Sequence, residues 1–257
     1  MSSPSFTQAL IQSHSEAYQA ATQSAFLRNA ARGKVPKATL GTWLANDRLY
    51  IHGYIRGTGR LLSFLGLPQT VAEQNHGSDA ATQLFDWSVD ALVNIRREEA
   101  FFVDTARRYG IDVNLPTGAD GAVVPQAAKL PGLQRFETLF DKLAPGPGSL
   151  LPWLESAVVF YGTEKCYLDA WTWAKSQLSG TTHNDDDGGA LRAEFIPNWT
   201  SADFVVFVDM LGKIIDDAVA EEVRRGDGKV WDVLMARVTP WWEELLAAEE
   251  GFWPAME

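Results

Sequence analysis

The sequence predicts an all-α protein, folded as one helical bundle over residues 1–257. Apolar residues recur at three- and four-residue spacing through most of the chain, which is the period of an amphipathic helix. Alternating β-branched runs bounded by turn residues, which would predict strands, are nearly absent. No shift in composition, fixed-period repeat or long flexible linker divides the chain, so a single domain is the simplest interpretation.

The predicted helices are bounded by residues that commonly begin or end helices. The stretch RGKVP separates the first two helices, GLPQT ends the second, and Ser201 in WTSADF is a favourable N-cap for a later one. With ends good to about four residues, the periodic segments are 4–31, 36–66, 79–109, 132–143, 150–178, 201–226 and 229–253.

Charged segments outside these apolar faces are predicted to be in contact with water. The polar insert SGTTHNDDDGGALR has an acidic centre, but Asp185 to Asp187 lack the positional pattern and terminal glutamate of a calcium loop. The run RREE at 96–99 is typical of a helix surface with local ion pairs. The histidines show no pairing at metal-ligand spacing, so we expect no metal site.

The composition favours a small-molecule ligand over a nucleic acid or a membrane. A formal net charge of -11 and a pI near 4.8 would repel both of those negatively charged partners at long range. Ten Trp and thirteen Phe can supply core volume or the walls of a pocket for a flat molecule. A neutral or cationic small molecule is therefore the expected partner, with no nucleic acid and no membrane.

The cysteine count and the N-terminal residues indicate a cytoplasmic protein. A single cysteine, Cys166, excludes a disulfide within the chain and an all-cysteine metal site, and it is expected to be a small buried apolar residue. The N-terminal residues lack a basic region followed by an apolar core, and no uncharged apolar run approaches a membrane span.

Asp47 lies where helical periodicity predicts a buried side chain. An α-helix turns about 100° per residue, so the residues of one face follow from their positions. Asp47 lies near the middle of an apolar arc, whereas Arg48 and His52 lie at its edge or beyond it. The arc consists of Leu40, Trp43, Leu44, Tyr50, Ile51, Tyr54 and Ile55.

Glu164 and Glu249 repeat this pattern in two later helices. Glu164 lies at the centre of a face whose opposite side carries Glu155 and Cys166. That face consists of Trp153, Ala157, Phe160, Tyr161, Tyr167, Leu168 and Trp171. Glu249 is surrounded by Trp242, Leu245, Leu246, Phe252 and Trp253.

Inward-pointing carboxylates have a structural and a functional interpretation. Burying an unpartnered carboxylate costs several kcal/mol, so each must have a partner or be protonated. A structural acid would be bonded to a tyrosine hydroxyl, an indole N–H or an arginine. If the acids converge instead, repulsion and burial would raise at least one pKa toward neutrality, as a general acid or base requires.

The sequence resembles the TenA (thiaminase II) family, whose fold is an all-helical, heme-oxygenase-like bundle. The resemblance runs in order through ATQSAFLRNAARGKVPKATLGTWLANDRLYIHGY, FYGTEKCYLDAW, FIPNWTSADF and LLAAEEGFW. It implies that Asp47 and Tyr50 occupy the family's W-L-x-x-D-x-x-Y substrate-binding motif. The terminal E-x-x-F-W motif places the family's catalytic glutamate at Glu249, followed by Phe252 and Trp253.

The sequence departs from this family at two positions. Its best-known branch has a cysteine nucleophile after a proline, but here Trp153 follows Pro152. A second branch lacks that cysteine and has a glutamate instead, and EKCYLDAW resembles its motif with Glu164, Tyr167 and Trp171. Trp199 stands where the family commonly has a tyrosine.

The resemblance implies a thiamin-salvage hydrolase that removes an amino or acylamino group from a 4-amino-2-methylpyrimidine. Asp47 would bind and polarise the ring, Glu249 would carry protons to the departing amine, and Glu164 would activate water or stabilise the cationic ring. The two glutamate roles could be exchanged. The expected walls of the pocket are Tyr50, Tyr54, Tyr167, Trp199 and Trp253. The resemblance implies no cofactor and a homodimer or homotetramer.

Two other functions are compatible with the same bundle. A non-catalytic protein could retain the aromatic cavity to bind a pyrimidine or thiamin-like ligand. A heme oxygenase-like protein would need a proximal histidine, for which His14 in HSEAY is the only suitable position. A lone histidine on a helix is more often simply exposed or bonded within the core.

Overall fold

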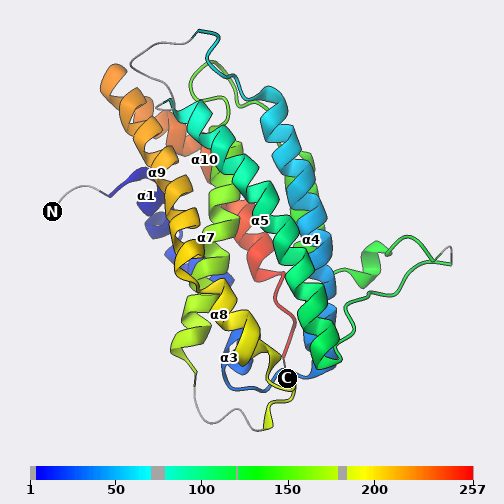
Figure 1. Cartoon of the computed structure of the whole chain (residues 1–257). Helices are drawn as coiled ribbons and strands as arrows, with labels where there is room; N and C mark the ends of the chain where they lie inside the picture. Colours follow the sequence, from blue (N-terminus) through cyan, green and yellow to red (C-terminus); the bar gives the residue numbers. More distant parts are fainter. Residues whose placement is uncertain (1–3, 71–78, 120, 179–183, 257) are drawn as a thin grey trace.

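The chain forms an all-α bundle, which the computed structural model describes for residues 4–70, 79–119, 121–178 and 184–256. Within these ranges every regular element is helical (Figure 1). The α-helices are α1 (Phe6–Ser13), α2 (Ser15–Thr22), α3 (Ala25–Ala31), α4 (Lys37–Phe64), α5 (Ala80–Tyr109), α6 (Pro131–Asp141), α7 (Leu154–Ser176), α8 (Ile196–Trp199), α9 (Ala202–Arg225) and α10 (Val230–Glu250). A 3₁₀ turn, η1 (Gln126–Ala128), and a π-helical turn, η3 (Leu191–Phe195), accompany them. The all-α prediction is confirmed.

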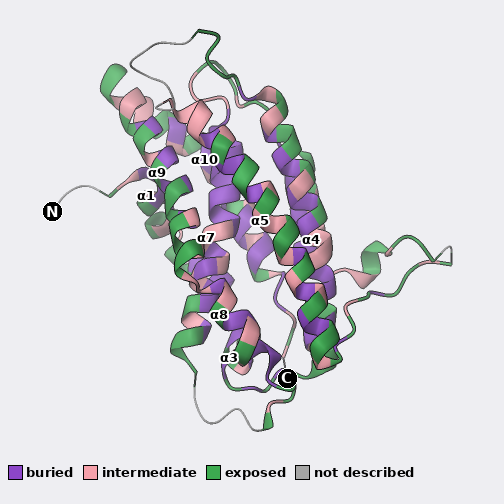
Figure 2. Cartoon of the chain, viewed as in Figure 1, coloured by how far each residue is buried: buried purple, intermediate pink, exposed green. Residues whose placement is uncertain are grey.

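Helix α7 occupies the middle of the bundle. It packs against α2, α3, α8, α9 and α10, while α4 packs against α5 and α6. Side chains on opposite sides of α7 are consequently buried, and the middle of α7 is coloured as buried in Figure 2. Glu155 lies on one such side, where Arg237 of α10 pairs with it at 2.8 Å. Among the described helices, none is both long and apolar enough to cross a bilayer.

Capping residues fix both ends of α5 and the start of α9, two helices that line the cavity described below. The Asp79 carboxylate accepts the N–H groups of Ala81 and Thr82 at 3.0 and 3.1 Å and so caps α5. The Ser201 hydroxyl accepts the Phe204 N–H at 3.3 Å and caps α9, as predicted. Gly110 ends α5 in the left-handed conformation, with φ of 64°.

The predicted first helix is wrong as a single element. Its range, 4–31, contains α1, α2 and α3, which are separated at His14 and at Gln23 and Ser24. Ser24 is extended and its hydroxyl accepts the Leu27 N–H at 3.2 Å, which starts a new helix. Apolar spacing continues across such breaks, so periodicity alone does not reveal them.

The acidic insert also differs from its prediction as a solvated loop. Asp185 pairs with Arg192 at 2.8 Å, and both side chains are at most 5% exposed. Asp187 accepts the backbone N–H groups of Gly189 and Leu191 at 2.8 and 2.7 Å. These two acids therefore have structural partners, whereas His183 lies outside the described residues.

A close backbone contact holds the start of α6 against the end of α10, beside Glu249. The Gly132 N–H donates to the Gly251 carbonyl at 2.9 Å. A Cβ atom added at Gly132 would lie 2.3 Å from the Ala248 carbonyl oxygen and 2.3 Å from the Phe252 nitrogen. Only a glycine therefore allows this approach.

Replacing Gly132 with Ala is expected to lower the free energy of unfolding by about 2–3 kcal/mol, because backbone atoms must move to relieve the overlap. Gly59→Ala in the exposed part of α4 is the matched control, since a Cβ there meets nothing within 4 Å. The control should gain about 0.5–1 kcal/mol from helix propensity. Urea unfolding of both variants measures the difference, and equal effects would contradict the steric argument.

Candidate functional site

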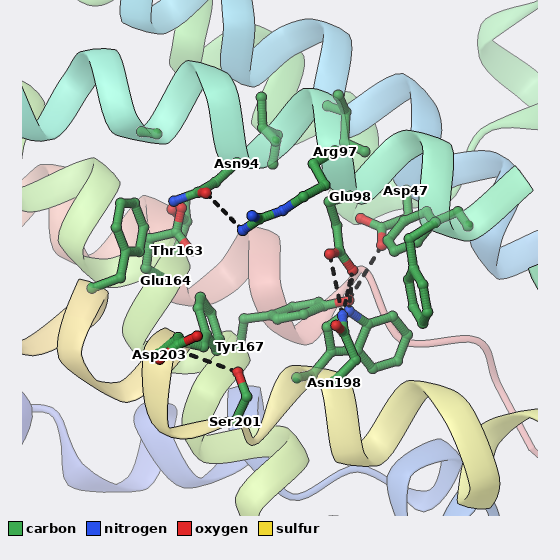
Figure 3. A pocket seen from close by; sticks show the side chains of 18 of the residues that line it. Asp47, Asn94, Arg97, Glu98, Thr163, Glu164, Tyr167, Asn198, Ser201 and Asp203 are labelled. Atoms are coloured by element: carbon green, nitrogen blue, oxygen red, sulfur yellow. Dashed lines mark hydrogen bonds between the residues drawn. The ribbon is translucent and has the colours of Figure 1, made fainter.

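A cavity of about 550 Å³ opens between α4, α5, α7, α8 and the start of α9. Its walls combine acids with aromatic rings (Figure 3). The lining residues are Asp47, Tyr50, Ile51, Ala91, Asn94, Ile95, Arg97, Glu98, Phe101, Phe102, Thr163, Glu164, Tyr167, Asn198, Trp199, Ser201, Asp203, Phe204 and Phe207. Five residues of the sequence-predicted site are in this set: Asp47, Tyr50, Glu164, Tyr167 and Trp199.

Asp47 lies on α4 and faces one end of the cavity. Its side chain points inward as the helical phase predicted, and the residue is 3% exposed. The Tyr167 hydroxyl of α7 donates to its Oδ2 atom over 3.4 Å. Burial raises the pKa of Asp47 well above its ordinary value, and the nearby Glu98 carboxylate raises it further. Asp47 is thus a weakly partnered buried acid facing open space.

Glu164 lies on α7, toward the other end of the cavity in Figure 3. The Tyr54 hydroxyl of α4 donates to its Oε1 atom at 2.7 Å, and Oε2 has no bond from a described side chain. Burial raises the pKa of Glu164 to about 7, against the lowering effect of the Tyr54 bond, while the charge of Glu98 raises it. At neutral pH this carboxyl can therefore either accept or release a proton.

Glu98 of α5 is a cavity residue that the sequence analysis assigned to a charged helix surface. Its carboxylate accepts the indole N–H of Trp199, and it accepts the Asn198 amide at 3.1 and 3.2 Å. Burial raises the pKa of Glu98, although these two donors and the charge of Arg97 act in the opposite direction. The two arginines of the run are exposed as predicted, and Arg96 pairs locally with Glu99. Glu99 itself is buried and also lies 3.6 Å from Arg48 of α4, which the surface prediction did not include.

The sequence did contain a signal for Glu98. Cavity-facing residues of α5 recur at three- and four-residue spacing, and Glu98 has the same helical phase as Ala91, Ile95 and Phe102. Helical phase thus places Glu98 on the inward face of 79–109, as it places Asp47 on the inward face of 36–66. The adjacent charges in RREE obscured this position, because they are typical of an exposed helix.

Glu249 of α10 is buried near the cavity but is not among the residues that line it. The residue is 5% exposed, and no described side chain donates a hydrogen bond to its carboxyl. Burial raises the pKa of Glu249 well above its ordinary value, and the charges of Asp47 and Glu164 add to this. Glu164 and Glu249 also raise the pKa of Tyr50 after burial does. Asp47, Glu164 and Glu249 therefore lie near enough for their charges to affect one another's surroundings, and the charges of both glutamates act on Tyr50.

Two predicted wall residues lie outside the cavity lining. Tyr54 is fully buried behind Glu164, where it serves as a hydrogen-bond donor. Trp253 belongs to the core, because its indole N–H donates to the Ala21 carbonyl at 2.7 Å and its ring stacks on Trp43 at 5.8 Å. Four aromatic side chains line the cavity without having been predicted from the sequence: Phe101, Phe102, Phe204 and Phe207. They come from α5 and α9, whose positions relative to α7 follow only from tertiary packing.

Cys166 and His14 do not line the cavity. Cys166 is fully buried, as predicted, and burial raises the pKa of its thiol well above the ordinary value. His14 joins α1 to α2, where its ring lies 2.9 Å from the Ser13 hydroxyl and 3.4 Å from Glu243. Among the described residues, no group of three potential metal ligands comes together. Neither a cysteine nucleophile nor a heme-binding histidine is therefore indicated at this site.

These features define an all-α protein with an acid-lined, aromatic cavity of small-molecule size. Solved TenA homologues have the same fold. The structure superposes on one from Pyrococcus furiosus with a TM-score of 0.67 and 20% identity, covering 96% of this chain and 98% of that one. A homologue from P. horikoshii gives 0.62 and 15%, covering 97% and 99%. The chain thus has the heme-oxygenase-like all-α fold of TenA proteins.

Two further similar proteins have the word transcription in their names. A TenA family transcription regulator from Silicibacter sp. gives a TM-score of 0.62 at 14% identity, covering 97% of both chains. A probable transcription factor from Fusarium pseudograminearum is 25% identical over an alignment 255 positions long, which covers 88% of this chain. The chain matches 47%, about half, of the length of that curated relative. No model of a known protein family matches the chain.

Proposed function

We propose that this chain is a member of the TenA family and hydrolyses a C–N bond on the methyl arm of a 4-aminopyrimidine. The observation that carries this proposal is Glu164, a carboxyl with a pKa of about 7 that lines the same cavity as Asp47. An acid that titrates near neutral pH can take a proton from water efficiently. The fold shared with TenA homologues supports the same reading.

In this mechanism the three acids have different tasks. Asp47 accepts hydrogen bonds from the amidine-like edge of the ring and thereby orients the methyl arm. Glu164 takes a proton from a water molecule, whose oxygen bonds to the arm carbon as the C–N bond breaks. Glu249 supplies the proton that the departing nitrogen acquires. The products are the hydroxymethyl pyrimidine and ammonia, and transfer of the proton from Glu164 to Glu249 restores both acids.

The positions of the two glutamates favour this division of roles. Glu164 lines the cavity and can contact a water molecule there, whereas Glu249 lies outside the lining. A proton from Glu249 would reach the cavity through the Tyr50 hydroxyl. Tyr50 lines the cavity, and the charges of both Glu164 and Glu249 raise its pKa. Burial keeps the pKa of Tyr50 well above its ordinary value, so the hydroxyl retains its proton for donation.

The proposal is tested by measuring ammonia release from 5-aminomethyl-4-amino-2-methylpyrimidine and formamide release from its N-formyl derivative, since both require cleavage of the bond between the arm carbon and nitrogen. The wild type should turn over at least one of them. Asp47→Asn should raise KM by about 10–100-fold, which corresponds to losing one charge-assisted hydrogen bond of about 1.5–3 kcal/mol. Glu16→Gln is the control, because Glu16 is exposed and lies outside the cavity lining. Absence of turnover of both compounds by the wild type would reject the hydrolase.

A binding protein without catalytic activity is the second candidate. The observation that favours it is the exclusion of Glu249 from the cavity lining, since a proton donor must reach the departing nitrogen. Saturable binding of the aminopyrimidine, measured by calorimetry, together with no ammonia release over hours would select this function. Release of ammonia at rates that depend on Glu164 would exclude it.

Two relatives have transcription in their names, but we do not propose that this chain binds nucleic acid. This chain has a formal net charge of -11, and DNA binding depends mainly on neutralising phosphate charges with Lys and Arg. The cavity residues point to a small ligand instead, because they combine acids and aromatic rings in a cavity of small-molecule size.

A further inference from the structure

Glu98 and Asp47 are two carboxylates held at the same end of the cavity. Their side chains point toward one region beside Asn198 in Figure 3. Tyr167 donates to Asp47 and Trp199 donates to Glu98, and the rings of these two donors are 5.3 Å apart. The charge of Glu98 is the second-largest cause, after burial, of the raised Asp47 pKa. The two acids are therefore close enough to repel each other.

The groups bonded to these acids are neutral. Trp199 and Asn198 donate to Glu98, and Tyr167 donates to Asp47, so none of them supplies a positive charge. In the described part of the chain, no lysine, arginine or histidine forms an ion pair with either acid. Arg97, the one basic residue among the cavity-lining residues, is exposed and donates to Asn94 at 2.9 Å. Asp47 is buried and Glu98 is half-buried, and only the exposed Arg97 acts on Glu98 through its charge, so a cationic ligand would relieve the repulsion between the two carboxylates.

Hydrogen bonds from Trp199 and Asn198 hold the Glu98 carboxylate at the cavity wall, where it can accept further bonds from a ligand. An indole N–H can only donate a hydrogen bond, and the Trp199 side chain uses that donor on Glu98. The Asn198 amide donates to both oxygens of the same carboxylate at 3.1 and 3.2 Å. An ionised carboxylate has about four acceptor positions, so these two neighbours leave capacity for donors on a ligand.

We propose that Asp47 and Glu98 together bind one cationic group of the ligand, and that Glu98 is a specificity-determining residue. The group is an amidinium edge, such as that of a ring-protonated 4-aminopyrimidine, or a protonated amine. Its flat donor-rich edge matches two carboxylates, and Tyr167 and Trp199 supply aromatic faces next to them. The proposal rests on the proposed function only in taking this cavity as the ligand site.

The test compares benzamidinium with benzamide, which have the same ring and similar shapes but differ in charge. Their affinities are measured by titration calorimetry at pH about 7 and low salt for the wild type and Glu98→Gln. The wild type should bind benzamidinium at least about tenfold more tightly than benzamide, and Glu98→Gln should lose most of this ratio while benzamide binding is retained. Glu16→Gln, which makes the same change at an exposed position outside the cavity lining, should keep the wild-type ratio.

Trp199→Phe separates positioning from charge. It keeps both carboxylates and most of the aromatic wall but removes the indole donor to Glu98. The benzamidinium affinity should fall less than in Glu98→Gln, and the loss should again be confined to the cationic probe. Circular dichroism of each variant verifies that the helical fold is retained.

The outcomes distinguish this proposal from the hydrolase. A Glu98-dependent preference for benzamidinium with no turnover of aminopyrimidines would support the cation site and reject the reaction. Turnover of aminopyrimidines with an unchanged benzamidinium to benzamide ratio in Glu98→Gln would support the reaction and overturn the cation site. Failure of the folded wild type to bind benzamidinium would also overturn it.

Discussion

Replacing Glu164 with Gln is expected to lower kcat/KM for aminopyrimidine hydrolysis by about 10²–10⁴-fold, because the variant has no base to activate water. In the wild type, kcat/KM should rise with pH through about 7, the pKa to which burial raises Glu164, as the carboxylate form becomes populated. The residual activity of Glu164→Gln should lack this rise. Initial rates between pH about 5 and about 9 measure both effects.

Tyr54→Phe is the matched variant for this pH dependence. The Tyr54 hydroxyl donates to Glu164 at 2.7 Å and lowers the pKa of that carboxyl. Removing the hydroxyl should therefore move the rise in kcat/KM to higher pH, without abolishing the plateau. A shift to lower pH, or full activity in Glu164→Gln, would contradict the assignment of Glu164 as the base.

The substitution Glu164→Gln should also change the free energy of unfolding in a pH-dependent way. The folded protein holds the Glu164 proton more tightly than the unfolded chain, so the free energy of unfolding falls as pH rises from 4.5 to about 7. Glu164→Gln removes that fall and should be more stable than the wild type at pH about 8, by about 2 kcal/mol after allowing for partial exposure.

Replacing Glu249 with Gln is expected to lower kcat by about 10²–10⁴-fold, because an amide cannot supply the proton that the departing nitrogen needs. The carboxyl is 5% exposed without a described hydrogen-bond donor, and burial followed by the charges of Asp47 and Glu164 raises its pKa. A raised pKa favours the protonated form, which is the form of a general acid. Single-turnover ammonia release isolates this step from product release.

The Glu249→Gln variant should gain stability while it loses activity. The stabilising contribution of a carboxyl with a raised pKa is present at low pH and lost as pH rises, whereas Gln does not titrate. At alkaline pH the variant should therefore be more stable than the wild type, as measured by urea unfolding. Glu250→Gln is the control, because Glu250 is the exposed neighbouring acid and should change neither property. Full activity of Glu249→Gln would identify Glu249 as a structural acid.

Helical phase predicted the burial of particular acids because that property depends mainly on position within one helix. Asp47 and Glu249 are 3% and 5% exposed, as the apolar neighbours on their own helices predicted. For α7 the phase was less informative. Neighbouring helices surround it, so Glu155 on the side opposite Glu164 is buried and pairs with Arg237, whereas Glu164 itself is half-buried.

The composition of the cavity depends on contacts between helices that are distant in sequence. Glu98 faces the cavity because α5 lies beside α9 and the α8 residues Asn198 and Trp199 meet its carboxylate. In the sequence these residues are separated by about a hundred positions, and the charged run around Glu98 is typical of a surface. Asp185 was misassigned for a local reason, since its partner Arg192 lies only seven positions further along the chain and is reached when the insert folds back.

By itself, the sequence determined the all-α class, the approximate ranges of the long helices and the inward phase of Asp47 and Glu249, because these follow from the period of the α-helix. Only the tertiary structure decided that Glu164 and Glu98 line the cavity with Asp47, whereas Glu249, Tyr54 and Trp253 do not. Whether an inward side chain meets a cavity or a packed core depends on the opposing helix, and that information is absent from any one helix taken alone.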